Sequence, residues 1–314
     1  INLICIEEGI DSSQTSGKLL ISVLSAVAEI ERENIIRLDT YKRNSFIFII
    51  LRKIYSIFKI TPNYEISHIK RIKNIDETII IFDSGITKSY LNKIDHLYNN
   101  STRRLILWYW NPIDYASIKP KDVPKRFEKW SYSIEDCRNY NLNYNTQFYF
   151  FPDYTNTSNN IDILFVGNDK GRFNILKEYK KYFDEKGFST YFHITKTHRY
   201  KIGKDYKKPI PYKMIQRLVE QSKVVLDIYR NPSAGPSLRV MEGIFYQKKV
   251  ITNNITFDQY SFYNESNVFV LKDENMQEID DFISRPFEKY NREILKYYTF
   301  NEWIKRFDNK EYLC

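Results

Sequence analysis

The chain has 314 residues and a formal net charge of +9; 42% of its residues are apolar and 16% aromatic. This composition excludes a disordered chain, because so many apolar side chains can bury a core, and the length suffices for two domains. The basic excess predicts an anionic partner, for which a nucleotide diphosphate, an acidic membrane surface and nucleic acid all qualify.

Residues 1–36 contain the turn Glu8-Gly-Ile-Asp-Ser12, the helix entry Ser16-Gly-Lys18 and the stretch Leu24-Ser-Ala-Val-Ala-Glu-Ile-Glu-Arg-Glu-Asn-Ile35. This segment resembles the last strand and the start of the long helix of the resolvase/invertase serine recombinase catalytic domain. The resemblance implies a role in dimerisation or DNA contact. The family's nucleophilic serine precedes this segment, so we assign no catalytic residue here and do not expect recombinase activity. The alternative is a plain strand followed by an amphipathic helix.

The start of the chain suggests a fusion. The sequence begins at Ile1, and residues 1–36 carry two basic and six acidic side chains, a net −4 against +9 for the whole chain. We expect a recombinase fragment joined near residues 36–45 to a second reading frame. We also expect the junction to have removed the first strand of the following lobe, which leaves open that the protein is inactive through truncation.

Residues 46–60 read as a basic amphipathic helix. Such a helix can lie on the inner face of a membrane, or it can simply cover a sheet. The apolar run is far shorter than the roughly 20 residues of a bilayer span. Cys5, Cys137 and Cys314 are too few and too far apart for a disulfide framework or a metal site, which favours a reducing cytoplasm.

Residues 45–152 alternate strands and helices and predict a first α/β lobe. Buried-type strands cover 77–83 and 104–110, with a helix at 88–98 between them. Ligands bind at the carboxyl ends of parallel strands. We therefore expect the acceptor-side residues Ser84, Tyr109 and Asn111 there, with Asp83 as general base. The alternative for Asp83 is a cap of the following helix.

A polar linker at 153–160 leads to a second α/β lobe at 161–274 and to helices at 275–314. The expected strands are 162–166, 189–194, 224–229, 249–252 and 268–271. The expected helices are 172–186 and 211–222, followed by a helix that starts after Ser237. This order predicts a doubly wound, Rossmann-like sheet.

The most informative stretch runs from Ser233 to Thr252. Gly235 and Pro236 break the preceding strand, and Ser237 is a good N-cap for a helix that carries Glu242 about a turn and a half inside. A helix start attracts anions through its free N–H groups and its dipole. A diphosphate could bind there, and the carboxylate could accept hydrogen bonds from ribose hydroxyls.

This loop, helix and strand resemble the donor-binding segment of GT-B glycosyltransferases from bacterial capsule and lipopolysaccharide clusters. The stretch Asp162-Ile-Leu-Phe-Val-Gly-Asn-Asp-Lys-Gly-Arg172 strengthens the resemblance, since it lies where such enzymes open their C-terminal domain. The fold implied is α/β with two Rossmann-like lobes, of which the N-terminal one is incomplete. The implied donor-binding residues are Lys170, Arg172, Tyr229, Asn231, Gly235, Ser237, Arg239 and Glu242.

The activity implied is transfer of a sugar from a nucleotide sugar to a polysaccharide or lipid-linked acceptor in surface glycan synthesis. We expect no metal, because no Asp-X-Asp motif lies at a strand end, and no cofactor beyond the donor substrate. Two other functions remain open at this point. One is a nucleotide-sugar binder without activity, and the other is a recombinase-related protein that binds DNA.

Overall fold

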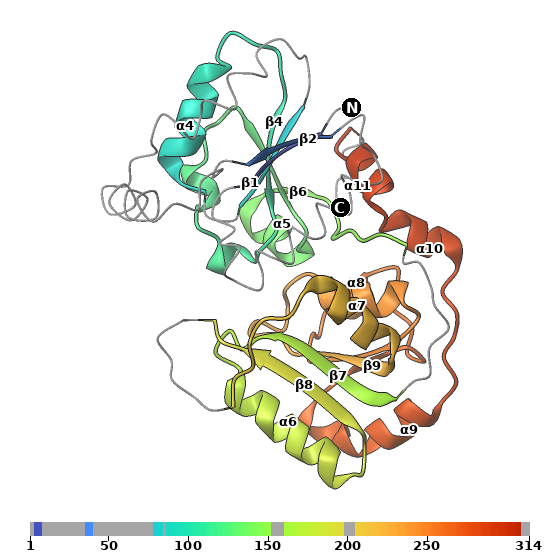
Figure 1. Ribbon diagram of the computed structural model, residues 1–314. Helices are drawn as coiled ribbons and strands as arrows, with labels where there is room; N and C mark the ends of the chain where they lie inside the picture. The colour runs from blue at the N-terminus through green and yellow to red at the C-terminus, as the bar shows by residue number, and fades with distance from the viewer. Residues whose placement is uncertain are drawn as a thin grey trace. The chain divides into compact units, whose positions relative to one another are not determined.

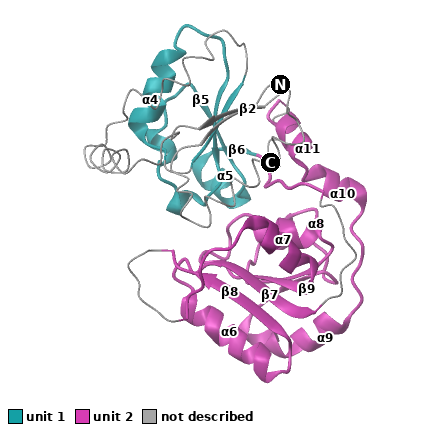
Figure 2. Cartoon of the chain, viewed as in Figure 1, with its two compact units in different colours: residues 1–12, 20–144, 312–314 teal, residues 13–19, 145–311 magenta. Residues whose placement is uncertain are grey.

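The computed structural model describes residues 3–7, 35–39, 78–83, 86–151, 160–197 and 205–308. They belong to two compact units, coloured separately in Figure 2. The described residues up to Tyr144 form the first unit, and those from Asn145 onward form the second. This boundary precedes the expected linker at 153–160, of which only Asn160 lies within the described residues.

The first unit contains a sheet of six parallel strands in the order β2-β1-β3-β4-β5-β6. The strands are β1 Leu3–Glu7, β2 Ile35–Asp39, β3 Ile79–Phe82, β4 Leu105–Tyr109, β5 Phe127–Ser131 and β6 Asn143–Tyr144. The predicted strands at 77–83 and 104–110 correspond to β3 and β4. Every residue of these two strands is buried, as a continuous apolar run predicts for a parallel sheet covered on both faces.

The sequence suggested that this sheet had lost its opening strand, and the structure corrects that expectation. Strand β1 pairs in parallel with β3, with Ile4 opposite Ile79, and with β2 on its other side. Both β1 and β2 come from residues assigned to the recombinase fragment and its junction. The segment therefore contributes two strands to the first unit. The expected helix at 46–60 lies outside the described residues.

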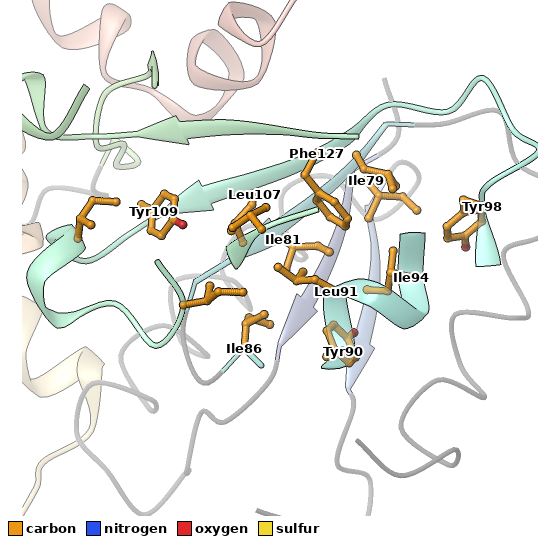
Figure 3. Close-up of a cluster of buried hydrophobic side chains, with 14 residues drawn as sticks. Ile79, Ile81, Ile86, Tyr90, Leu91, Ile94, Tyr98, Leu107, Tyr109 and Phe127 are labelled. Carbon is orange, nitrogen blue, oxygen red and sulfur yellow. The ribbon is translucent and has the colours of Figure 1, made fainter. Parts of the chain in front are cut away.

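Helix α4 (Lys88–Leu97) packs on one face of this sheet (Figure 3). It begins after Thr87, whose Oγ1 accepts a hydrogen bond from the backbone N–H of Tyr90 at 3.2 Å. Tyr90, Leu91 and Ile94 form its apolar stripe and are fully buried against β3 and β4. Helix α5 (Ile134–Tyr140) begins after Ser133 and ends at Asn141, which adopts φ 52°.

The second unit contains five parallel strands in the order β11-β10-β9-β7-β8. The strands are β7 Ile161–Asn168, β8 Thr190–Thr195, β9 Ser222–Asp227, β10 Lys249–Thr252 and β11 Val268–Val270. The helices are α6 Phe173–Glu185, α7 Tyr212–Glu220, α8 Leu238–Phe245, α9 Ile279–Ser284, α10 Arg292–Tyr297 and α11 Phe300–Arg306. Short 3-10 helices cover Phe257–Gln259 and Asp273–Glu278 in this unit, and Ile113–Tyr115 and Pro120–Asp122 in the first unit. Each predicted element of this unit is present, with ends shifted by a few residues.

Helices cover both faces of the second sheet: α6 and α9 lie on one face, and α7 and α8 on the other (Figure 1). The chain leaves the inner strand β7 for β8 on one side and then returns to β9 on the other side. The winding direction therefore changes between β7 and β9. In doubly wound sheets, ligands bind outside the carboxyl ends of the strands at this point.

The last helix completes the core of the second unit. Trp303 and Phe300 of α11 contact Phe148, with ring centroids 4.6 and 5.2 Å apart. Arg306 donates hydrogen bonds to Asn145 Oδ1 at 3.1 Å and Thr146 Oγ1 at 2.7 Å. No helix within the described ranges is long and apolar enough to cross a membrane.

Candidate functional site

A tight turn follows β7 at the carboxyl edge of the second sheet. It spans Asp169 to Arg172, with Lys170 at φ 44° and Gly171 at φ 81°, and the N–H of Arg172 donates to the carbonyl of Asp169 at 2.7 Å. Gly171 adopts its positive φ at little cost, whereas a positive φ is uncommon for a residue with a side chain such as Lys170. Thr197 holds the turn from the neighbouring strand end, because its Oγ1 accepts a hydrogen bond from the N–H of Lys170 at 2.7 Å.

The Asp169 carboxylate fixes this turn. It accepts hydrogen bonds from the backbone N–H of Thr197 at 2.8 Å and from the phenol of Tyr206 at 3.0 Å. Burial works against the charged form, but these hydrogen bonds outweigh it and lower the pKa of Asp169. The carboxylate is thus occupied by the protein, and so is the N–H of Lys170. A ligand at this turn would therefore contact the exposed side chain of Lys170 more readily than the Lys170 N–H.

Arg172 joins the ends of the two strands at which the winding changes. Its guanidinium donates to the carbonyls of Asp169 at 3.1 Å, Asn168 at 2.8 Å and Ile228, the residue that follows β9. Burial, and after it the charge of Arg239, lowers the pKa of Arg172 to about 10. The sequence placed this side chain on a diphosphate, whereas the structure directs these three donors to main-chain carbonyls.

Arg239 lies across the end of β7. Its Cζ is 4.8 Å from the ring centroid of Phe165, and its Nε is 3.3 Å from Oδ1 of Asp227, the last residue of β9. Gly167 leaves room for the guanidinium, since a Cβ there would lie 3.1 Å from Nη1. That Nη1 is buried and has no hydrogen-bond partner among the described residues. A buried donor without an acceptor is costly, so this nitrogen is suited to an incoming anion.

Four cationic side chains gather at this edge, and we call Lys170, Arg172, Arg230 and Arg239 the basic edge. Their charges act on one another, with Asp227 as the carboxylate among them. The surrounding protein, and then the charges of Arg172 and Arg239, lower the pKa of Lys170 to about 8, although the residue as a whole is exposed. The basic edge therefore keeps a positive charge at neutral pH and is electrostatically suited to a phosphate ligand.

The amino end of α8 borders the basic edge. Ser237 is its N-cap, as predicted, and its Oγ accepts from the N–H of Arg239 at 3.1 Å while donating to Asp227 Oδ2 at 2.5 Å. The N–H of Ser237 donates to the hydroxyl of Tyr229 at 2.7 Å. The amide that the sequence assigned to a diphosphate is thus bound by Tyr229 in this structure, so an anion would have to displace that hydroxyl.

Glu242 lies inside the second unit with only 2% of its surface exposed. Burial raises its pKa to about 7, although a hydrogen bond with Tyr212 and the charge of Arg239 act against the shift. Tyr212 in turn shares a hydrogen bond of 2.5 Å with the hydroxyl of Tyr149. A ribose contact to Glu242 remains a prediction, and it would have to be made alongside this buried network.

Two asparagines that the sequence did not single out hold the loops of the site. Asn253 accepts from the N–H of Tyr229 at 2.6 Å and donates to its carbonyl at 3.1 Å, and Asn254 donates to the carbonyl of Ala234 at 2.5 Å. Both residues follow β10 directly. Their position after a strand was the sequence signal that could have identified them as residues of the site. Among the predicted residues, Asn231 accepts from Ser233 within the loop, and Gly235 is buried.

The acceptor-side residues belong to the first unit. Asp83 is 1% exposed, and its Oδ1 accepts from the backbone N–H groups of Trp110 at 2.7 Å and Asn111 at 3.2 Å. Burial raises the pKa of Asp83 to about 7 despite these bonds. Its carboxylate thus anchors the loop after β4. Tyr109 lies in the core with no exposed surface (Figure 3), Asn111 is partly buried, and Ser84 falls outside the described residues.

No protein-family model and no curated protein sequence matches the chain. Among solved structures, that of TarM is similar with a TM-score of 0.50 and 10% identity, over 78% of this chain and 58% of TarM. The glycotransferase of kitacinnamycin follows with a TM-score of 0.48 and 10% identity, over 98% of both chains. A glycosyltransferase from Rickettsia africae ESF-5 has a TM-score of 0.38 and 12% identity, over 98% of this chain and 96% of that one.

The likeness to TarM concerns the fold. This chain spans less than two thirds of the length of TarM, with an identity of only 10%. Together with the two parallel sheets, the likeness confirms the predicted α/β fold with Rossmann-like lobes of the GT-B kind. Within the described ranges, no three His, Cys, Asp or Glu side chains come together so as to hold a metal ion.

Proposed function

We propose that the chain is a glycosyltransferase that uses a nucleotide-sugar donor. The diphosphate of the donor binds the basic edge of the second unit, and the first unit binds the acceptor. The observation that carries the proposal is the side chain of Arg239. Its Nη1 is buried and has no hydrogen-bond partner among the described residues, and its charge acts together with that of Arg230 on Lys170. This arrangement lies at the carboxyl ends of β7 and β9, where a doubly wound sheet binds its ligand.

The basic edge suits the chemistry of glycosyl transfer. The bond between the anomeric carbon and the diphosphate oxygen breaks, and a bond to an acceptor hydroxyl oxygen forms. Negative charge accumulates on the leaving diphosphate as the first bond breaks. Fixed cations such as Arg239 stabilise that charge without having to reorganise during the reaction. Arg172 supports them by holding the strand ends on which they are mounted.

The acceptor hydroxyl loses a proton in the same step. We keep Asp83 as the proposed base, since its pKa of about 7 suits proton transfer near neutral pH. Its carboxylate already accepts two backbone hydrogen bonds, so it would act from an anchored position. We further propose that the acceptor is a polysaccharide or a lipid-linked glycan of the cell surface. Support for this finer assignment comes from the resemblance of the segments 162–172 and 233–252.

Calorimetric titration with UDP- and GDP-sugars tests the proposal. We expect one of these donors to bind, and Arg239→Ala to weaken binding at least about tenfold, because it removes a charge-assisted contact. Lys223→Ala is the matched control, since Lys223 is an exposed cation at the opposite end of β9. Failure of all these donors to bind would refute the proposal. Sugar transfer by the same preparation would separate an enzyme from an inactive binder.

The alternative proposal is a recombinase-related protein that binds DNA. Its support is the motif match of residues 1–36, of which the structure describes 3–7 and 35–36. These residues contribute to β1 and β2 of the first unit. Salt-sensitive binding to duplex DNA, without affinity for nucleotide sugars, would favour this alternative.

A further inference from the structure

The loop after β4 in the first unit displays aromatic and polar side chains at the carboxyl edge of the sheet. We call residues 110–117 the aromatic loop. Tyr115 is 49% exposed, Asp114 is exposed, and Trp110 and Asn111 are partly exposed. Between them Ile113 has no exposed surface and ties the loop to the core. The loop therefore combines an apolar base with two rings and a carboxylate that reach the surface, while the Asn111 amide donates to both Asp83 carboxylate oxygens at 3.4 Å.

The aromatic loop is held in one conformation by side chains from other elements. Asp83 after β3 accepts from the N–H groups of Trp110 and Asn111, and Asp136 of α5 accepts from the N–H of Ile113 at 3.1 Å. Lys119 donates to the carbonyls of Ile113 at 2.5 Å and Asp114 at 3.1 Å.

These anchors are costly. Burial raises the pKa of Asp83 to about 7 and that of Asp136 to about 6, so ionising either carboxyl is less favourable in the folded chain than in water. A loop held in one conformation loses less entropy when a ligand binds to it.

Trp110 is held by other rings. It meets Trp108 edge to face at 5.4 Å and Phe82 at 5.9 Å with an interplanar angle of 51°. Trp108 is fully buried, whereas Trp110 reaches the surface. The indole is thus supported from below and partly open to solvent. Rings of this kind present a flat apolar surface at low entropic cost.

We propose that the aromatic loop is the acceptor site and that it binds the pyranose rings of a neutral glycan. Trp110 and Tyr115 pack against the C–H faces of the sugar, and Oδ1 of Asn111 accepts hydrogen bonds from its hydroxyl groups, since Nδ2 of Asn111 donates to Asp83. The inference rests on the proposed function, since it names the acceptor of that reaction. It assigns recognition to two aromatic residues, one of which, Trp110, lies next to the anchored Asp83.

Charge favours a neutral ligand over an anionic one. Asp83 and Asp136 accept hydrogen bonds from the loop, Asp114 lies on it, and Lys119 donates to its carbonyls. These groups comprise three carboxyl groups and one ammonium, so their balance is acidic once the carboxyl groups are ionised. An acceptor rich in phosphate or uronate would be repelled here, in contrast to the basic edge of the second unit.

The test is saturation-transfer NMR on the full chain with neutral trisaccharides of glucose, galactose and N-acetylglucosamine, without nucleotide. We expect at least one of them to bind, and Tyr115→Ala to weaken its binding about fivefold, in line with the loss of one aromatic contact. Trp110→Phe keeps a ring in the packing with Phe82 and Trp108, and we expect a weaker loss of about threefold. Tyr140→Ala is the matched control, because Tyr140 is 41% exposed on the same unit but lies on α5.

The outcomes separate this inference from the proposed function. If nucleotide sugars bind and none of the trisaccharides does, or if Tyr115→Ala and Trp110→Phe bind as tightly as the unmodified chain, the inference is overturned and the glycosyltransferase proposal stands. If trisaccharides bind through Tyr115 and nucleotide sugars do not bind, the aromatic loop stands and the donor proposal fails. In an active enzyme, Tyr115→Ala should raise the KM of the acceptor about fivefold and leave that of the donor unchanged.

Discussion

Gly167 and Arg239 share one small space: a Cβ atom on Gly167 would lie 3.1 Å from Nη1 and 3.4 Å from Cζ of Arg239. The lack of a side chain at position 167 therefore lets the guanidinium lie against β7 and over the ring of Phe165. A residue in one strand thus sets the position of a cation in a helix that follows two strands later.

Gly167→Ala should weaken the binding of a nucleotide sugar without unfolding the protein. The added methyl group displaces the guanidinium by a few tenths of an ångström, and we expect binding to weaken about fivefold through poorer charge-assisted contacts. Calorimetry measures the affinity, and the thermal midpoint should move by less than about 3 °C. If Arg239→Ala loses binding but Gly167→Ala keeps the affinity of the unmodified chain, the exact position of this guanidinium does not determine the affinity.

Arg172 and Lys170 should differ in what they contribute. Arg172→Lys removes the hydrogen bonds to the ends of β7 and β9, and we expect a loss of about 2 kcal/mol in the free energy of unfolding. Lys170→Ala removes an exposed cation, so stability should stay within about 0.5 kcal/mol. Urea unfolding measures both values. Nucleotide affinity should fall in Lys170→Ala, and an equal loss of stability in the two variants would contradict the division of roles.

Gly243→Ala should destabilise the second unit. A Cβ at position 243 of α8 would lie 2.7 Å from Cγ2 of Val250, a fully buried residue of β10. The helix would have to move away from the sheet, at a cost of about 1 to 3 kcal/mol. Chemical denaturation measures this cost. Gly243→Ala should cost less free energy of unfolding when it is made in a Val250→Ala background than in the unmodified chain. An equal cost in both backgrounds would mean that the contact is relieved in another way.

Glu242→Gln should change how stability depends on pH. The pKa of Glu242 is raised in the folded chain from 4.5 to about 7. The protonated form is therefore favoured by folding, and this stabilisation is complete below pH 4.5 and is lost as pH rises to about 7. Relative to Glu242→Gln, the unmodified chain should lose about 1.4 kcal/mol per pH unit over that window. Urea unfolding at pH 5, 6, 7 and 8 gives this difference, and a constant difference would refute the shifted pKa.

The strands that the sequence predicted each contain consecutive apolar residues. Strands β3 and β4 are apolar throughout, and β7 and β9 contain the apolar runs Ile163–Val166 and Val224–Leu226; such runs are recognisable without knowledge of their neighbours. Strand β5 was missed because Phe127-Glu-Lys-Trp-Ser131 mixes polar and apolar residues and only partly buries Glu128 and Lys129. Strand β1 was read as part of another protein, and only its pairing with β3 places it in the first unit.

By itself, the sequence determined the α/β alternation, the two lobes and the Ser237 cap of α8, because periodicity and capping depend on residues a few positions apart. Only the tertiary structure decided the use of each polar side chain. Arg172 meets the carbonyl of Ile228, Glu242 meets Tyr212, and Asp83 meets the N–H of Trp110, each at least 27 positions away in the chain. A buried polar group takes whatever partner the fold brings to it, and that partner is set by how strands and helices pack.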